Sequence, residues 1–171
     1  MREGYVQVYT GNGKGKTTAA LGLALRAAGA GMKVFIAQFI KEERCSEHLA
    51  LERFGDMIAY RQYGRGLIMK APSEEDIAVS REGMREINEA VHSGAYDVVI
   101  LDEVNVAVSL GLVGVEEVLA LMREKPRSVE LVLTGRNAHE EVIKGADLVT
   151  EMCEIKHYYR NGVGARRGIE K

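Results

Sequence analysis

The sequence predicts an α/β protein with a mostly parallel sheet and helices on both faces. Short apolar runs typical of strands alternate along the chain with segments of helical periodicity. Parallel strands need long crossover connections, which helices supply best. The length of 171 residues fits one domain. Hydrophobic residues make up 46% of the chain and charged residues 28%, with only 2 prolines, which argues against a disordered or fibrous protein.

Strands are predicted where β-branched, aliphatic and aromatic residues cluster, giving about six strands in one sheet. Their ranges are 5–10, 33–39, 57–63, 98–101, 128–134 and 148–156. The run V-V-I-L at 98–101 is apolar throughout, as is typical of a strand buried on both faces.

Helices are predicted over residues 17–30, 73–93, 115–125 and 138–144. The second begins with Ser73 and Asp76 at the spacing of a capping box. Four apolar residues then fall on one face at helical spacing: Ile77, Met84, Ile87 and Val91. Pro126 ends the third helix, and the fourth is expected to start at an N-cap Asn137 and to stop at Gly145.

Charge and cysteine content favour a cytoplasmic protein. The 23 basic and 25 acidic residues leave a net charge of -2, so we expect no nucleic-acid or membrane surface. Cys45 and Cys153 lack the spacing of a zinc site or a disulfide framework. The N-terminus has no signal-peptide pattern, and no apolar stretch is long enough to span a membrane, so we expect neither export nor insertion.

The strongest local signal is the segment T-G-N-G-K-G-K-T at residues 10–17, placed between a predicted strand and a predicted helix. It matches the phosphate-binding pattern G-x-x-x-x-G-K-[ST], with a threonine at the first glycine. Backbone N–H groups of such a loop and the dipole of the next helix bind phosphate oxygens. The expected nucleotide-binding residues are Thr10, Gly11, Asn12, Gly13, Lys14, Gly15, Lys16, Thr17 and Thr18.

Two side chains of this loop indicate binding of phosphate and of a metal ion. Lys16 is placed to supply a charge to the phosphates, and the Thr17 hydroxyl to ligate Mg²⁺. A plain glycine-rich turn is the alternative, but it gives no reason for a lysine and a threonine at these two positions. The G-x-G-x-G spacing of the glycines disfavours a dinucleotide fingerprint.

Asp102 and Glu103 follow the predicted strand 98–101, at the edge where ligands of parallel sheets collect. Asp102 is the expected acidic partner of the magnesium, with an N-cap role as the alternative. Lys16 and Glu103 are the predicted catalytic residues. Glu103 would orient water in an ATPase, whereas in another transfer it would hold the metal shell or the substrate.

Weaker candidates lie outside this pair of motifs. Arg136 follows the strand 128–134 and is expected to approach a phosphate or a substrate carboxylate, with a solvated loop arginine as the alternative. The histidines have no metal-ligand spacing among themselves and are interpreted as surface or capping residues: His48, His92, His139 and His157.

As a set, these residues resemble the P-loop family of ATP:corrinoid adenosyltransferases. Five ordered blocks carry the resemblance: residues 8–20, 37–41, 98–105, 133–139 and 156–170. Thr10 in place of the first glycine is also what this family shows. The resemblance implies a RecA-like fold, a homodimer, and transfer of the 5'-deoxyadenosyl group of ATP to a Co(I) corrinoid with release of triphosphate. It further implies that the nucleotide lies reversed in the loop, and that a reduced flavoprotein supplies electrons.

The end of the chain departs from the regular pattern. We expect residues 1–156 to form the P-loop nucleotide-binding domain and residues 157–171 to be a basic tail of the same domain, with a role as a flap over the site. The tail and the loop 64–69 are predicted to form a mobile lid on the corrinoid side. The apolar residues Leu67, Ile68 and Met69 would cover the macrocycle. Its polar side groups would meet Arg65, Arg166 and Arg167. A solvent loop with a frayed terminus is the alternative.

Two other functions use the same loop. One is a P-loop kinase or ATPase that produces ADP, with Glu103 or another carboxylate activating a hydroxyl or water. The other is a regulatory module that binds ATP without turnover. Neither explains the four blocks outside the P-loop.

Overall fold

The computed structural model describes residues 3–41, 45–66, 68 and 71–170. It contains one six-stranded sheet in the order β3-β2-β4-β5-β1-β6, and every neighbouring pair is parallel. The strands are β1 (Val6–Thr10), β2 (Val34–Phe39), β3 (Ile58–Tyr63), β4 (Val98–Asp102), β5 (Glu130–Thr134) and β6 (Leu148–Glu151). The predicted α/β class is therefore confirmed, and the described sheet is parallel throughout.

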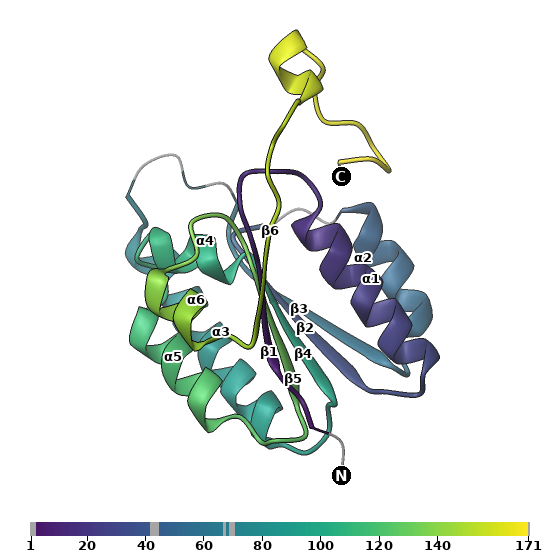
Figure 1. Ribbon diagram of the computed structural model, residues 1–171, viewed down its shortest axis with the longest axis vertical. Helices are drawn as coiled ribbons and strands as arrows, with labels where there is room; N and C mark the ends of the chain where they lie inside the picture. The colour runs from purple at the N-terminus through teal and green to yellow at the C-terminus, as the bar shows by residue number, and fades with distance from the viewer. Residues whose placement is uncertain (1–2, 42–44, 67, 69–70, 171) are drawn as a thin grey trace.

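Helices cover both faces of the sheet, as predicted (Figure 1). They are α1 (Lys16–Gly29), α2 (Ser46–Leu51), α3 (Glu74–His92), α4 (Val104–Ser109), α5 (Val115–Glu124) and α6 (Glu140–Gly145). Two 3-10 turns, η1 (Glu52–Phe54) and η2 (Tyr158–Asn161), complete the described elements. Helices α1 and α2 lie on one face and α3 to α6 on the other.

The core has two layers because successive strand residues point to opposite faces. Val98 and Ile100 pack with Ala24 of α1 in one layer. Val99 and Leu101 pack in the other layer, which also contains the buried face of α3. Burial on both faces explains why these strands are apolar throughout instead of alternating with polar residues.

Helix α3 forms as its sequence predicts. The Ser73 hydroxyl accepts a hydrogen bond from the Asp76 N–H at 3.2 Å, and Asp76 Oδ2 accepts one from the Ser73 N–H at 2.9 Å. This reciprocal cap satisfies backbone donors at the start of the helix. Met84, Ile87 and Val91 are buried in the core, which confirms the predicted apolar face.

Several predicted boundaries were wrong. Strand β6 ends at Glu151, not at residue 156, because the chain then leaves the sheet to brace the P-loop. Asn137 is not an N-cap, since it has a φ of 57° and the cap of α6 is His139. Gly145 is the last residue of α6 instead of the residue after it.

Two short helices were missed by sequence reasoning. Helix α2 lies within a strongly charged run without an extended apolar face, and α4 has the sequence V-N-V-A-V-S, whose valines are typical of a strand. Both helices are held by packing on the sheet, through Leu51 and Val104. Local propensity alone does not reveal helices of this length.

The topology brings the carboxyl ends of β1, β4 and β5 to one edge of the sheet (Figure 1). The P-loop follows β1, Asp102 ends β4, and Thr134 ends β5. Ligands of open parallel sheets bind at this edge. Across the described ranges, no helix is long and apolar enough to cross a membrane.

Candidate functional site

The P-loop is shaped by glycines and braced by the segment after β6. Gly15, at the N-cap of α1, has a φ of 121°, a backbone conformation that glycine adopts without a Cβ penalty. The Gly13 N–H donates to the Met152 carbonyl at 2.6 Å, and a Cβ on Gly13 would lie only 2.6 Å from that oxygen. The loop therefore packs too closely on its brace to accept a side chain at residue 13.

Lys16 is folded back into the loop. Its Nζ donates to the carbonyl oxygens of Gly11 and Gly13, both at 2.7 Å. Burial, followed by the nearby Arg136 guanidinium, lowers the pKa of Lys16, while Glu103 and Asp102 oppose this shift. The cation is thus held by the loop that is predicted to bind phosphate.

Asp102 is a buried carboxylate that accepts hydrogen bonds from three side chains. Oδ1 accepts from the hydroxyls of Thr134 at 2.6 Å and Thr17 at 2.9 Å, and Oδ2 accepts from Gln38 Nε2 at 2.7 Å. Asp102 is not an N-cap, because that position before α4 belongs to Glu103. The P-loop hydroxyl and the strand-end carboxylate meet, as the sequence motifs predict.

Glu103 turns the chain from β4 into α4. Its φ of 62° is in the left-handed region, and its N–H donates to Thr134 Oγ1 at 3.0 Å. Burial, followed by the charge of Asp102, raises the pKa of Glu103, whereas Lys41 and Lys16 lower it. A strained backbone position at this edge is typical of functional sites.

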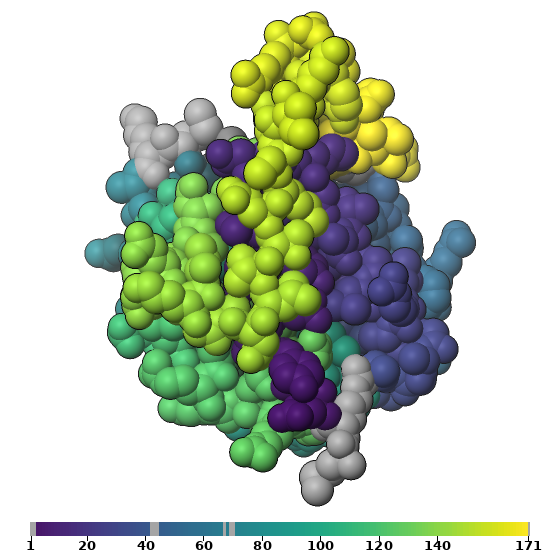
Figure 2. Space-filling view, viewed as in Figure 1, coloured from purple at the N-terminus to yellow at the C-terminus, as the bar shows by residue number. Residues whose placement is uncertain are grey.

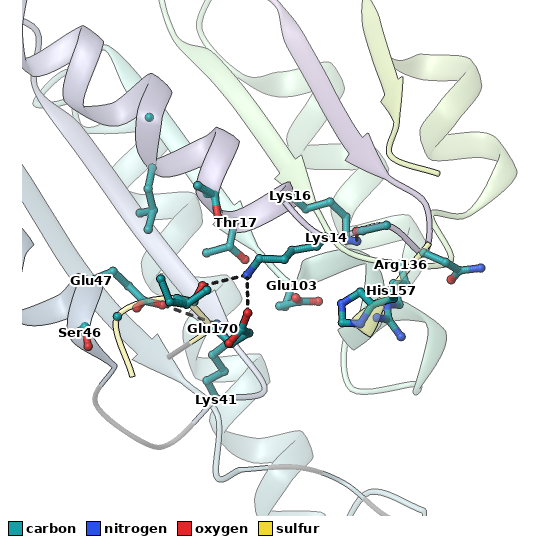
Figure 3. A pocket seen from close by; sticks show the side chains of 18 of the residues that line it. Lys14, Lys16, Thr17, Lys41, Ser46, Glu47, Glu103, Arg136, His157 and Glu170 are labelled. Carbon is teal, nitrogen blue, oxygen red and sulfur yellow. Dashed lines mark hydrogen bonds and ion pairs between the residues drawn. The ribbon is translucent and has the colours of Figure 1, made fainter. Parts of the chain in front are cut away.

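A cavity of about 740 Å³ lies over the P-loop (Figure 3). This volume is within the range of ligand sites. Its lining includes the predicted residues Asn12, Gly13, Lys14, Gly15, Lys16, Thr17, Thr18, Glu103 and Arg136. Thr10 is buried, and its hydroxyl accepts from the Ala138 N–H at 3.4 Å. Asp102 lies below the cavity, in contact with Thr17.

Sequence reasoning missed part of the lining. Lys41, Ser46 and Glu47 come from the segment after β2 and the start of α2. The tail, which the sequence predicts as a flap, adds Glu170 to the lining. Lys41 Nζ lies 3.8 Å from Glu47 Oε1. The A-Q-F-I-K block is the signal that pointed to the first of these segments, but no local pattern placed it beside the P-loop.

The tail folds back onto the P-loop (Figure 2). Lys14 Nζ donates to the Ile169 carbonyl at 2.8 Å and lies 3.7 Å from Glu170 Oε1. Glu170 also accepts hydrogen bonds from Arg166 Nη2 at 3.1 Å and from the Tyr158 hydroxyl. The Arg166 guanidinium lies over the Tyr158 ring, 4.9 Å from its centroid. These contacts hold the end of the tail against the P-loop.

The bonds of Glu170 predict an acid-sensitive tail. Arg166, followed by Tyr158, lowers the pKa of Glu170 to about 2 from its ordinary value of 4.5. A carboxylate with a lowered pKa stabilises the folded tail above its unfolded pKa, and this stabilisation is lost as the pH falls from 4.5 toward about 2. The Arg166 amide donates to Glu170. As the pH falls through this interval, we expect its protection from hydrogen exchange, relative to the intrinsic rate at each pH, to decrease.

The substitution Glu170→Gln tests the same stabilisation at neutral pH. It removes the charge, so tryptic cleavage after Arg160 and Arg166 should be several-fold faster than in the wild type. Glu141→Gln, which breaks an exposed pair with Lys144 on α6, is the control and should leave tail cleavage unchanged. Equal cleavage of the Glu170→Gln and wild-type tails would contradict this account.

A second cavity of about 590 Å³ lies within the tail. Tyr158, Tyr159 and Val163 line it, together with Arg136 and His157, which also line the first cavity. Of the predicted lid loop, Leu67 and Met69 lie outside the described residues. Ile68 packs against the core, and Arg65 pairs with Glu75.

The histidines form no metal site within the part of the chain that the structure describes. His139 and His157 accept backbone hydrogen bonds at the starts of α6 and η2, which confirms their capping interpretation. His48 also caps α2, but it is only 3% exposed and contacts the Tyr60 hydroxyl, so it is not a surface residue.

Comparison with known proteins adds independent information. The family model described as ATP:corrinoid adenosyltransferase BtuR/CobO/CobP matches residues 2–170. A corrinoid adenosyltransferase of Sinorhizobium sp is 37% identical, over 98% of this chain and 80% of the relative. The corrinoid adenosyltransferases of Pseudomonas aeruginosa and Escherichia coli (strain K12) are 35% and 36% identical, over 98% of this chain and 83% and 85% of the relatives. The similarity thus extends through all five sequence blocks.

Proposed function

Because the chain belongs to the ATP:corrinoid adenosyltransferase family, we infer that its P-loop site holds ATP for transfer of the 5'-deoxyadenosyl group to a corrinoid. The observation that carries this function is the match over residues 2–170, which includes the blocks outside the P-loop. A kinase or a purely regulatory module would need the P-loop but not those blocks. The adenosyltransferase function is therefore favoured over both alternatives.

The reaction needs little acid–base chemistry from the protein. A Co(I) corrinoid is a strong nucleophile; its electron pair forms the cobalt–carbon bond at C5' of ATP, and the C5'–oxygen bond breaks. The electrons of that bond leave with triphosphate, so no proton has to be removed from the nucleophile. The contribution of the protein is then positioning and stabilisation of the leaving group.

Lys16 and the loop amides are suited to the leaving group. The Lys16 ammonium is held beside the carbonyls of Gly11 and Gly13, so ATP binding would exchange these contacts for triphosphate oxygens. A preorganised cation at that point stabilises negative charge as it develops. Arg136, which also lines the cavity and lies near Lys16, would add a second cation.

The donor set fits Mg²⁺. The Thr17 hydroxyl and the Asp102 carboxylate are hard oxygen ligands that already lie 2.9 Å apart, at the carboxyl edge of the sheet. These two residues would hold the ion, which when bound neutralises charge on the triphosphate. Glu103, beside Asp102 and close to Lys16 and Lys41, would support the ligand shell of the ion or orient the substrate.

The tail is suited to the corrinoid side. Its cavity shares Arg136 and His157 with the nucleotide cavity, so a ligand there would face the bound nucleotide. Tyr158, Tyr159 and Val163 offer apolar and aromatic surface to a flat macrocycle. The flap role predicted for residues 157–171 remains part of this proposal.

We also propose a homodimer, a reduced flavoprotein as electron donor, and a cytoplasmic location. The edge strand β6 supports the first, because all four of its residues are exposed, including Leu148 and Val149. An exposed apolar edge is a surface for a second chain. Light scattering of the purified protein tests the dimer.

The product test separates the functions. ATP, Mg²⁺ and cobalamin reduced chemically to Co(I) are supplied without oxygen, and the phosphate products are separated by chromatography. Adenosyl transfer gives triphosphate and adenosylcobalamin in equal amounts. A kinase or ATPase gives ADP whether or not Co(I) is present, and that result would reject the adenosyltransferase assignment.

A further inference from the structure

A line of buried and partly buried hydrogen bonds connects the start of α2 with the carboxylate of Asp102. Gln38 on β2, Tyr60 on β3 and His48 on α2 carry it. Gln38 is 2% exposed and His48 is 3% exposed, so water competes little for these bonds. The line ends at Asp102, whose carboxylate contacts Thr17 in the lining of the nucleotide cavity.

The donors and acceptors of this line follow in one order. A backbone N–H can only donate, so the 2.9 Å bond from Cys45 makes His48 Nδ1 an acceptor and leaves the ring proton on Nε2. His48 Nε2, at 2.6 Å, therefore donates to the Tyr60 oxygen. Tyr60 donates to Gln38 Oε1 at 2.7 Å, and Gln38 Nε2 donates to Asp102 Oδ2 at 2.7 Å.

The sheet register explains why these side chains meet. Gln38 is paired with Asp102 on β4, while Tyr60 is paired with Ile36, two residues before Gln38 and on the same face. Helix α2 covers that face and brings the His48 ring to 4.4 Å from the Tyr60 ring. Burial raises the pKa of Tyr60, so its hydroxyl keeps the proton that it donates to Gln38.

We propose that Tyr60 and His48 are positioning residues that fix the Gln38 amide with its N–H group toward Asp102. The inference rests on the proposed function, in which Asp102 binds magnesium. If the amide turned over, Gln38 Oε1 would face Asp102 Oδ2, and two acceptors would repel each other. The same line ties Asp102 to α2, whose Ser46 and Glu47 form another wall of the cavity.

The first test removes one hydroxyl. Tyr60→Phe keeps the ring against His48 but lets the Gln38 amide turn over, and calorimetric titration with ATP at a series of Mg²⁺ concentrations measures the result. No corrinoid is present, so no turnover occurs. We expect the Mg²⁺ concentration for half-maximal ATP binding to rise by about 3- to 10-fold. The effect stays in this range because Gln62 Nε2 also donates to Gln38 Oε1, at 3.3 Å.

Tyr63→Phe is the matched control. Tyr63 is on the same strand, but it packs in the opposite core layer and its hydroxyl donates to Glu86 at 2.6 Å. This variant also loses one tyrosine hydrogen bond, so it accounts for any general loss of stability. Its Mg²⁺ dependence should equal that of the wild type.

A pair of His48 variants separates positioning from helix capping. His48→Gln places an amide nitrogen near the Nε2 position and keeps a donor for Tyr60, whereas His48→Asn places an oxygen near Nδ1 and keeps only the cap. The proposal expects a near wild-type Mg²⁺ dependence in the first and a raised requirement in the second. A purely capping role expects the reverse, and that result would overturn the proposal.

Nitrogen NMR of the wild-type protein tests the line without any substitution. The resonances of ¹⁵N-labelled His48 should show a protonated Nε2 and an unprotonated Nδ1, and the opposite tautomer would overturn the proposal. An unchanged Mg²⁺ dependence in Tyr60→Phe, with a raised requirement in Asp102→Asn, would overturn it while the proposed function stands. Absence of ATP binding to the wild type would overturn both.

Discussion

Lys16→Ala should lower the rate of adenosyl transfer by about 10²-fold or more and weaken ATP binding. The triphosphate leaving group carries several negative charges, and Lys16 is a buried P-loop lysine that lines the cavity. Its contacts with the carbonyls of Gly11 and Gly13 hold the ammonium within the loop. Single-turnover formation of adenosylcobalamin, with the amount of triphosphate, measures the loss.

Lys144→Ala is the control for this variant. Lys144 is an exposed lysine of α6 that pairs with Glu141 at 2.7 Å and lies outside the cavity lining. Its removal should leave the transfer rate unchanged, while circular dichroism verifies that both variants are folded. Near wild-type turnover in Lys16→Ala would remove this lysine from the mechanism.

Asp102→Asn should raise the Mg²⁺ concentration required for activity by about 10-fold or more, because the neutral amide no longer attracts the cation. The fold should persist. The asparagine oxygen can accept from Gln38, and its amino group can donate to the hydroxyl oxygens of Thr17 and Thr134, which rotate to suit. Activity and ATP binding, each titrated with Mg²⁺, measure the change.

Asp97→Asn provides the comparison. Asp97 directly precedes β4, at the amino-terminal ends of the strands and away from the cavity lining. Its carboxylate accepts from the Lys33 N–H at 2.8 Å. Its substitution should leave the Mg²⁺ requirement unchanged, whatever it does to stability. A wild-type magnesium response in Asp102→Asn would show that this aspartate serves only the packing of the strand ends.

The magnesium titrations of Asp102→Asn and Tyr60→Phe form a series. Both act on the same carboxylate, the first by removing its charge and the second by releasing the amide that orients it. The direct loss should therefore exceed the indirect one. In the double variant the two effects should not add, because Gln38 has no carboxylate left to orient.

The sequence by itself determined the parts of this protein that depend on adjacent residues. The P-loop needs glycines, a lysine and a threonine at fixed spacing between a strand and a helix, and all of them are contiguous in the chain. The buried strands are recognisable because burial on both faces requires an apolar residue at nearly every position. Asp102 was predicted as a metal ligand because it ends such a strand, at the edge where ligands of open parallel sheets generally bind.

Only the tertiary structure decided which distant residues meet. The strand order places β2 beside β4, so Gln38 reaches Asp102, and packing of α2 on β3 brings His48 to Tyr60. The contact of Glu170 with Lys14 likewise depends on the path that the tail takes after β6. Such contacts leave no local signal, because the pairing of strands and the docking of short helices follow from the burial of the whole sheet.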